Sequence, residues 1–139
     1  MTTLGKILDH AGLDALNVLD AQIDVPALAA VQAQGDLIIL PRPMKRATTP
    51  IPAAGVTIVR AESAARNTHT LHSWVGPTCL WDFVDNGPAD LILGVLTVPE
   101  GATAYLVHSE EHGANAMAPG SYEIRRQREM ADTIRIVQD

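Results

Sequence analysis

The hydrophobic and polar positions change their period near Gly35. Before it, apolar residues recur three and four positions apart, which is typical of short amphipathic helices. After it, short alternating runs such as "VTIVRAE", "TAYLVH" and "YEIRR" are divided by turn signals such as "DNGPAD", "PEGA" and "APG". The pattern predicts a mainly β domain at residues 35–139, a small β-barrel or sandwich of the jelly-roll or cupin-like kind. A helical N-terminal arm at residues 1–34 is predicted to precede it.

Three short helices are predicted within the arm. The first follows Thr3, a candidate N-cap, and stops at Gly12. A less regular helix follows in "GLDALNVLDAQI". The third is predicted to begin at Asp24, to carry Pro26 in its first turn, where the missing N–H costs little, and to end at Gly35.

The apolar side chains of the first two helices need a surface to cover them, because helices this short do not persist unpacked. We predict that they lie in an interface between subunits of a symmetric oligomer or lattice. The alternative is that the helices cover one mouth of the β domain of the same chain. The predicted interface residues are Leu4, Ile7, Leu8, Leu13, Leu16 and Leu19.

A proline-rich segment, "PRPMKRATTPIPAAG", follows the first predicted strand. Proline cannot donate a ladder hydrogen bond, so this segment is predicted to be a loop or an arm that protects a sheet edge. Further along, "APGSYEI" predicts a tight turn at Pro119 and Gly120, with positive φ at the glycine, leading into a core strand through Tyr122 and Ile124.

Composition and charge exclude some partners. The chain has 139 residues, enough for one domain with its own core, and a net charge of −6. An acidic balance argues against general affinity for nucleic acid or anionic membranes, which need a basic face. Its longest apolar run is too short to span a bilayer, and the N-terminus lacks the pattern of a signal peptide. We therefore expect a soluble protein, cytoplasmic or on the surface of a virion or particle.

The single cysteine, Cys79, excludes an internal disulfide and is expected to be a buried structural thiol. The histidines carry the most specific candidate chemistry. His69, His72, His108 and His112 are the candidate metal ligands, with Glu110 or Glu111 as an added carboxylate and zinc or iron as the candidate ion.

Spacing weighs against that metal site. On a regular strand, residues three apart point to opposite faces, so His69 and His72 do not converge. His108 and His112 fall in a predicted loop, "HSEEHG", with no recognised ligand interval. The competing interpretation is that the histidines are hydrogen-bonding residues at strand ends. We predict no cofactor and no stoichiometric transition metal in the isolated protein.

The run "YEIRRQRE" places cations near a core face. With Tyr122 and Ile124 inward, Arg126 and Arg128 follow on the same face, and a buried guanidinium needs a carboxylate partner. The functional interpretation is an anion or partner-protein contact, and the structural one is a network of ion pairs. The candidate carboxylates are Glu110, Glu111, Asp82 and Asp85.

From "QGDLIIL" through "NTHTLH" and "HSEEHG" to "APGSYEIRRQRE", the chain resembles a group of small uncharacterised proteins from bacterial and phage genomes. The resemblance covers roughly the last 105 residues, and its C-terminal motif is the specific part. The chain departs from the group at "HTLH", where the group has His-x-His. The resemblance implies a shared fold and provenance, with no activity to transfer.

The sequence is compatible with three functions. The first is a non-enzymatic assembly component, such as a decoration protein of a phage or phage-like capsid, which contacts itself and a shell protein. The second is a metal-dependent, cupin-like enzyme that uses the four histidines. The third is a small regulatory binding module that contacts its partner through basic residues: Arg42, Lys45, Arg46, Arg125, Arg126 and Arg128.

Overall fold

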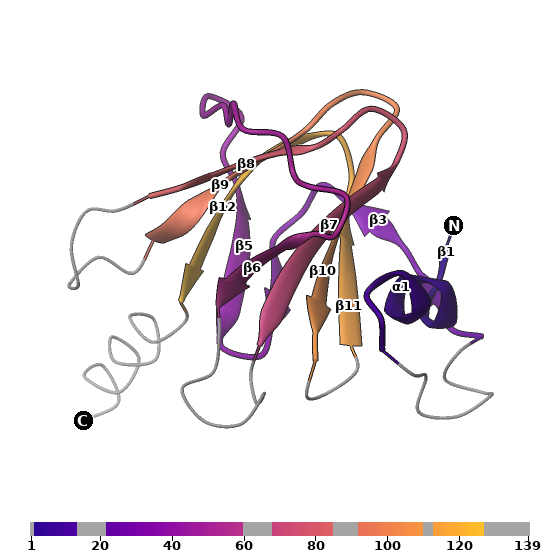
Figure 1. The fold of residues 1–139 in the computed structure, drawn as a ribbon. Helices are drawn as coiled ribbons and strands as arrows, with labels where there is room; N and C mark the ends of the chain where they lie inside the picture. Colours follow the sequence, from indigo (N-terminus) through magenta and orange to yellow (C-terminus); the bar gives the residue numbers. More distant parts are fainter. Residues whose placement is uncertain (1, 14–21, 60–67, 85–91, 110–112, 127–139) are drawn as a thin grey trace, which may run out of the picture.

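Two five-stranded sheets pack face to face in the computed structural model, which describes residues 2–13, 22–59, 68–84, 92–109 and 113–126 (Figure 1). In spatial order, the β7–β10 sheet consists of β3 (Ala27–Leu28), β11 (Gly113–Met117), β10 (Thr103–His108), β7 (His69–Val75) and β6 (Val56–Val59). The β9–β12 sheet consists of β4 (Gln32–Gln34), β5 (Leu37–Pro41), β12 (Gly120–Arg126), β9 (Ile92–Val98) and β8 (Leu80–Phe83).

The chain alternates between the sheets by hairpins. β4–β5 and β8–β9 pair in one sheet, and β6–β7 and β10–β11 pair in the other, all antiparallel. Long-range pairing of β7 with β10 and of β9 with β12 joins the hairpins. Neither sheet closes on itself within the described residues, so the predicted mainly β fold is confirmed and takes the form of a sandwich.

The core lies between the inner faces and follows from the alternation of the strands. Tyr122 and Ile124 are buried in it, as predicted, and Cys79 is a buried free thiol beside them. Burial raises the pKa of the Cys79 thiol. The other strand residues of this core are Leu37, Ile39, Ile58, Leu71, Trp81, Leu96, Val98, Ala104, Leu106 and Met117.

One helix, α1 (Leu4–His10), lies beside the β10–β11 end of the sandwich (Figure 1). Thr3 caps it, accepting a hydrogen bond from the backbone N–H of Lys6, and Gly12 follows its end at φ +78°, both as predicted. Its buried residues Ile7 and Leu8 pack against the outer face of the β7–β10 sheet. No helix among the described residues is long and apolar enough to cross a lipid bilayer.

The predicted third helix, from Asp24 to Gly35, is wrong. The chain forms β2 (Asp24–Val25), which pairs with β1 (Thr2–Thr3), and then β3 and β4. Gly35 lies at φ +55° in a two-residue turn between β4 and β5, because Gln34 pairs with Leu37. A short helix with a narrow apolar stripe has little stability of its own, and unpaired strand edges offer this segment backbone partners instead.

The proline-rich segment covers the edge of β8, as predicted. Ile51 donates its backbone N–H to Cys79 O at 2.9 Å, Trp81 donates its backbone N–H to Thr49 O at 2.7 Å, and Pro50 bridges to Leu80. Pro50 and Pro52 have no backbone N–H group, so neither of them donates a hydrogen bond to this ladder. The segment therefore blocks further pairing at β8 without forming a regular strand.

Replacing Gly120 by Val is expected to lower the free energy of unfolding by about 1–3 kcal/mol, because only glycine adopts its φ of +148° at little cost. The nearest atom to an added Cβ is Tyr122 Oη at 3.6 Å, so strain and not collision produces the loss. Urea unfolding measures it. Gly113→Val is the matched control, since a Cβ there meets nothing within 4 Å. Equal stability of the Gly120 variant and the native chain would contradict this backbone geometry.

Candidate functional site

Two of the four candidate histidines meet. His69 opens β7 and His108 ends β10, directly opposite in the antiparallel register. Both are buried, and their rings are stacked with centroids 4.3 Å apart and planes 5° from parallel. Gly35 lies against both ring edges, since a Cβ there would be 3.1 Å from His69 Cε1 and 3.2 Å from His108 Cε1.

Polar side chains of the arm and of β11 connect to this pair. His69 Nδ1 lies 2.9 Å from Gln34 Oε1, and Gln34 Nε2 donates to Leu106 O at 2.7 Å and to Asn115 Oδ1 at 2.9 Å. Asn115 Nδ2 in turn donates to Gln32 Oε1 at 3.1 Å. The Gln34 Nε2 atom donates to two acceptors, so the amide oxygen of Gln34 is the atom that faces the imidazole of His69. His69 Nδ1 therefore carries the proton and donates it to that oxygen.

These amides were not predicted from the sequence. Gln32 and Gln34 share one face of β4 because they are two residues apart, and Gln34 is buried. A glutamine pair at strand spacing was the available signal, but it fell inside the segment that was predicted to be helical. Asp36 adds a carboxylate oxygen 3.4 Å from His69 Nε2.

His72 does not join the pair. It lies on the outer face of β7, where its Nε2 atom is 2.9 Å from Thr70 Oγ1, so the predicted divergence of His69 and His72 is confirmed. Gly55 lies against it, because a Cβ there would be only 2.6 Å from the imidazole. His112, Glu110 and Glu111 lie outside the described residues.

The geometry of the stacked pair does not fit a shared metal ion. The lone pair of an imidazole nitrogen lies in the ring plane, and the planes of His69 and His108 run nearly parallel, so their lone pairs do not converge. Among the described residues, no group of three or more His, Cys, Asp or Glu side chains is placed to hold a metal.

We therefore predict less than a tenth of an equivalent, roughly, of zinc or iron per chain in protein purified without added metal. Elemental analysis by plasma mass spectrometry measures this. One equivalent that disappears in the His69→Ala and His108→Ala variants would overturn the prediction and support the metal-dependent enzyme.

Acid is expected to destabilise the protein partly through His72. Burial, together with the charge of His10, lowers the pKa of His72 from its ordinary 6.5. The unfolded chain therefore takes up more protons at this site as pH falls below about 6.5, so this site lowers the free energy of unfolding there and contributes no pH dependence well above it. Thermal unfolding between pH 7.5 and 5.5, roughly, measures the slope. His72→Gln should have a shallower slope, and an unchanged slope would contradict this role.

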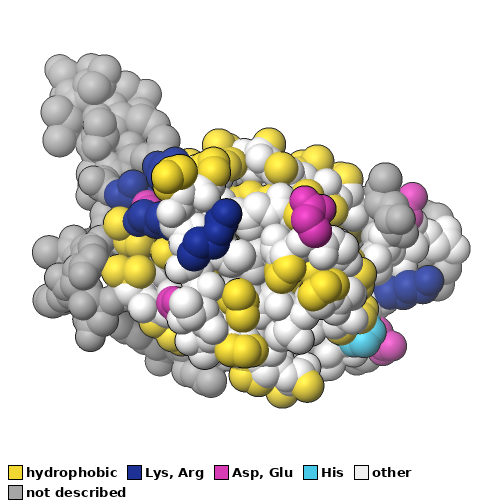
Figure 2. Space-filling view, turned by 90° about the horizontal axis from the view of Figure 1, so that it is seen from above, with side chains coloured by type: hydrophobic (Ala, Val, Ile, Leu, Met, Phe, Trp, Pro, Cys, Tyr) yellow, Lys and Arg dark blue, Asp and Glu magenta, His cyan; other side chains and the backbone are white. Residues whose placement is uncertain are grey.

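A second cluster forms around Glu123 on the outer face of β12. The Glu123 side chain is 4% exposed, and its carboxylate lies 2.7 Å from Lys45 Nζ, 3.5 Å from Arg125 Nη1 and 4.0 Å from Arg42 Nε. A network of ion pairs therefore exists, but its carboxylate is Glu123 and its cations are Lys45, Arg125 and Arg42, whereas the prediction was made for Arg126 and Arg128. In the view from above, most of the visible Lys and Arg side chains gather toward one side of the molecule, at the left of the picture (Figure 2).

Asp82 was predicted to pair with arginine, but its partners are backbone N–H groups. It accepts hydrogen bonds from the backbone N–H groups of Thr48 and Thr49, at 2.9 and 3.0 Å. Hydrogen bonds from Thr49, followed by those from Thr48, lower the pKa of Asp82. Glu110, Glu111, Asp85 and Arg128 lie outside the described residues.

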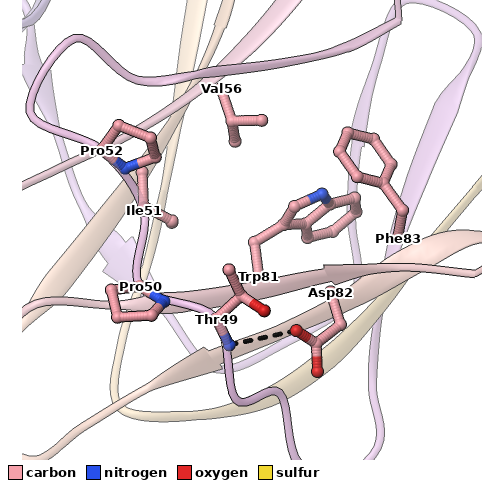
Figure 3. Close-up of a pocket in the computed structure, with 8 residues that line it drawn as sticks. All are labelled: Thr49, Pro50, Ile51, Pro52, Val56, Trp81, Asp82 and Phe83. Atoms are coloured by element: carbon pink, nitrogen blue, oxygen red, sulfur yellow. Dashed lines mark hydrogen bonds between the residues drawn. The ribbon is translucent and has the colours of Figure 1, made fainter.

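A cleft of about 570 Å³ opens beside these threonines, between the edge strands β6 and β8 (Figure 3). Its walls are mostly apolar. The residues that line it are Thr49, Pro50, Ile51, Pro52, Val56, Trp81, Asp82 and Phe83.

Residues 33–127 match the model of a protein family described as a domain of unknown function, DUF8820. The match covers more than half of the chain, from β4 to the residue after β12. The chain belongs to this family. The resemblance to an uncharacterised family is therefore confirmed. Searches among curated proteins and among solved structures found no match.

The histidine pair with Gln34 and Asn115, and the cleft at Trp81, lie within the part of the chain that matches DUF8820, and Gln32 comes one residue before it. The α1 helix lies outside it.

Proposed function

We propose that this DUF8820 protein is a non-enzymatic assembly component that works through contacts between copies of itself and with a shell protein, as a decoration protein of a phage or phage-like particle does. The observation that carries the proposal is the exposure of large apolar side chains on the arm. Ile23, Leu28 and Val31 are 52%, 41% and 62% exposed within nine residues. Scattered exposed aliphatic residues are ordinary, whereas three in one short segment favour a contact surface.

The leucine stripe of the helices plays a different part in this proposal. Ile7 and Leu8 pack against the sheet of their own chain, and Leu4 and Leu13 are half-buried beside them. Leu16 and Leu19 lie outside the described residues. Within one chain, the helix therefore anchors the arm, and the segment after it presents the apolar surface. In an exchanged dimer, the same anchoring contacts would join two copies.

Weak attachment of the exposed segment also supports the proposal. β3 pairs with β11 over only two residue pairs, and β2 pairs with β1 over two. Covering the three side chains with a partner would contribute about 3 kcal/mol before ordering costs. The attachment allows the segment to adjust to that partner without disturbing the sandwich.

Sedimentation velocity tests the proposal with the full chain. The native protein is expected to form oligomers at micromolar concentration, and the triple variant Ile23→Ser, Leu28→Ser, Val31→Ser is expected to be monomeric with an unchanged far-ultraviolet circular dichroism spectrum. Met44→Ser is the matched control, because Met44 is 95% exposed in the loop after β5. A native monomer, or a triple variant of native mass, would contradict the self-contact.

A binding module is the second candidate, and the cluster around Glu123 favours it. Arg42 and Lys45 come from the loop after β5 and Arg125 from β12, so residues far apart in sequence meet over one carboxylate. The excess positive charge suits an acidic protein segment. A hexaglutamate peptide should bind with an affinity that falls with salt and with Arg42→Gln, and absence of binding at low salt would remove this candidate.

A further inference from the structure

Trp81 carries a buried polar atom that the fold does not use. The residue is 3% exposed, yet its indole Nε1 has no hydrogen-bond partner among the described residues. A buried N–H group without an acceptor is costly, and buried indoles usually have one. Figure 3 shows this nitrogen on the side of the ring that faces the space between Val56 and Phe83. The unused donor therefore faces the cleft, but the atom itself is buried, so a ligand must displace a lining side chain to reach it.

Neighbouring residues hold the indole in that position. Gly94 of β9 lies against its six-membered ring, since a Cβ there would be 2.4 Å from Trp81 Cζ2 and 2.6 Å from Cη2. Phe83, on the same side of β8, meets the indole edge to face, with centroids 5.5 Å apart at 85°. A larger residue at position 94 would displace the ring, so the strand pairing itself places the donor.

The cleft has the size and the walls of a small-molecule site. Its volume of about 570 Å³ lies within the usual range for ligand pockets. The prolines, Ile51, Val56 and the two aromatic rings supply an apolar lining, and Phe83 is still 58% exposed at the mouth. Such walls bind an apolar or aromatic body, while a single directed donor orients it.

Charge restricts the ligand further. Asp82 is the only ionisable side chain among the lining residues that the structure describes, and hydrogen bonds from Thr49 and Thr48 lower its pKa and so keep it negative. A carboxylate or phosphate would lose its hydration in this mostly apolar cleft, and the charge of Asp82, on the other face of β8 from Trp81 and Phe83, repels it further. The indole N–H requires an acceptor, which an ammonium group lacks.

We propose that this cleft is a binding site for a small neutral organic molecule with an apolar or aromatic body and a carbonyl oxygen that accepts the Trp81 Nε1–H hydrogen bond. The site is separate from the arm and from the histidine pair, and it does not depend on the assembly function.

Proton–nitrogen correlation spectra of the ¹⁵N-labelled full chain test the proposal directly. The chain has two tryptophans, so two indole signals are expected, and Trp81→Phe assigns them. Trp74 is the internal control, since it stacks on Tyr105 and His10 at the outer face of the other sheet. Benzamide is the probe. It should shift the Trp81 indole proton downfield with saturation in the millimolar range and leave the Trp74 signal in place.

Two matched probes test the effect of ligand charge and the effect of the hydrogen-bond acceptor separately. Benzoate has the same body with a negative charge and should bind on the order of ten-fold more weakly than benzamide. Toluene keeps the body and lacks the acceptor, so it should bind equally well to the native chain and to Trp81→Phe, whereas benzamide should lose on the order of ten-fold in the variant. Ligand-observed saturation transfer measures the affinity for the variant.

Val56→Phe fills the space that the donor faces and should abolish the benzamide shift, while a Trp81 indole signal is still observed. The proposal is overturned if benzamide causes no saturable shift of that signal, or if benzoate binds as tightly as benzamide. It is also overturned if the Trp81 signal changes with protein concentration in the absence of a probe, because a second copy of the chain then covers the cleft.

Discussion

Replacing Gly76 by Ala is expected to cost about 4 kcal/mol of unfolding free energy, a large part of the stability of a domain of this size. Gly76 begins the turn between β7 and β8, at φ +70°, and an added Cβ would lie 1.9 Å from the backbone oxygen of Gly101. That oxygen belongs to the turn between β9 and β10 and cannot move as a side-chain end would. Left-handed strain contributes about 1–2 kcal/mol, and separating the two turns contributes about 1–3 kcal/mol more.

Gly101→Ala is the matched control for this prediction. Its φ is +82°, close to that of Gly76, but the nearest atom to an added Cβ is Pro77 Cδ at 3.7 Å. Only the strain of the left-handed backbone remains at this position, so the free energy of unfolding is expected to fall by about 1 kcal/mol. Urea unfolding followed by tryptophan fluorescence compares the two. Equal losses would show that the two turns do not approach as closely as described.

Replacing Gln34 by Leu is expected to cost about 3 kcal/mol. The amide is buried, and it accepts from His69 Nδ1 while it donates to Leu106 O and Asn115 Oδ1. Leucine has a similar volume but satisfies none of these groups, so a buried imidazole N–H and a buried carbonyl lose their partner together. Because Gln34 joins β4 of one sheet to β10 of the other, both sheets are affected.

Gln32→Leu provides the comparison for Gln34→Leu. Gln32 lies two residues away on the same strand face and donates to Ala116 O at 2.9 Å, but it is only half-buried, so water can replace its partners. Its loss is expected to be about 1 kcal/mol. Chemical denaturation of both variants measures the difference. If Gln34→Leu is no less stable than Gln32→Leu, the amide network does not connect the sheets.

The histidines show how far spacing carries a site prediction. The two-residue alternation of a strand correctly predicted that His69 and His72 point to opposite faces, because the face of each residue depends only on spacing within its own strand. The contact between His69 and His108 depends on the register of β7 against β10, across 39 residues of chain. Turn lengths and packing of the whole sandwich set that register. The parallel stack, which decides against a shared ion, follows from it.

The ion pairs around Glu123 and the strands of the arm also depend partly on local spacing and partly on tertiary pairing. Glu123 and Arg125 were recognisable as neighbours on one face, but Lys45 reaches them only because β5 pairs with β12. The arm after α1 had enough apolar spacing for a weak helix, and its actual strands exist because β1, β11 and β5 offer edges to pair with. The competing tertiary hydrogen bonds determined the outcome.

The sequence by itself determined the alternating strands, the first helix with its Thr3 cap, the positive φ at Gly120 and the inward faces of Tyr122 and Ile124. Each of these depends on residues a few positions apart, where sterics and periodicity act directly. Only the tertiary structure decided the strands of residues 24–34, the buried pair of histidines and the cleft that contains the Trp81 N–H group. These depend on which strands pair and in what register, and that is a property of the whole packed chain.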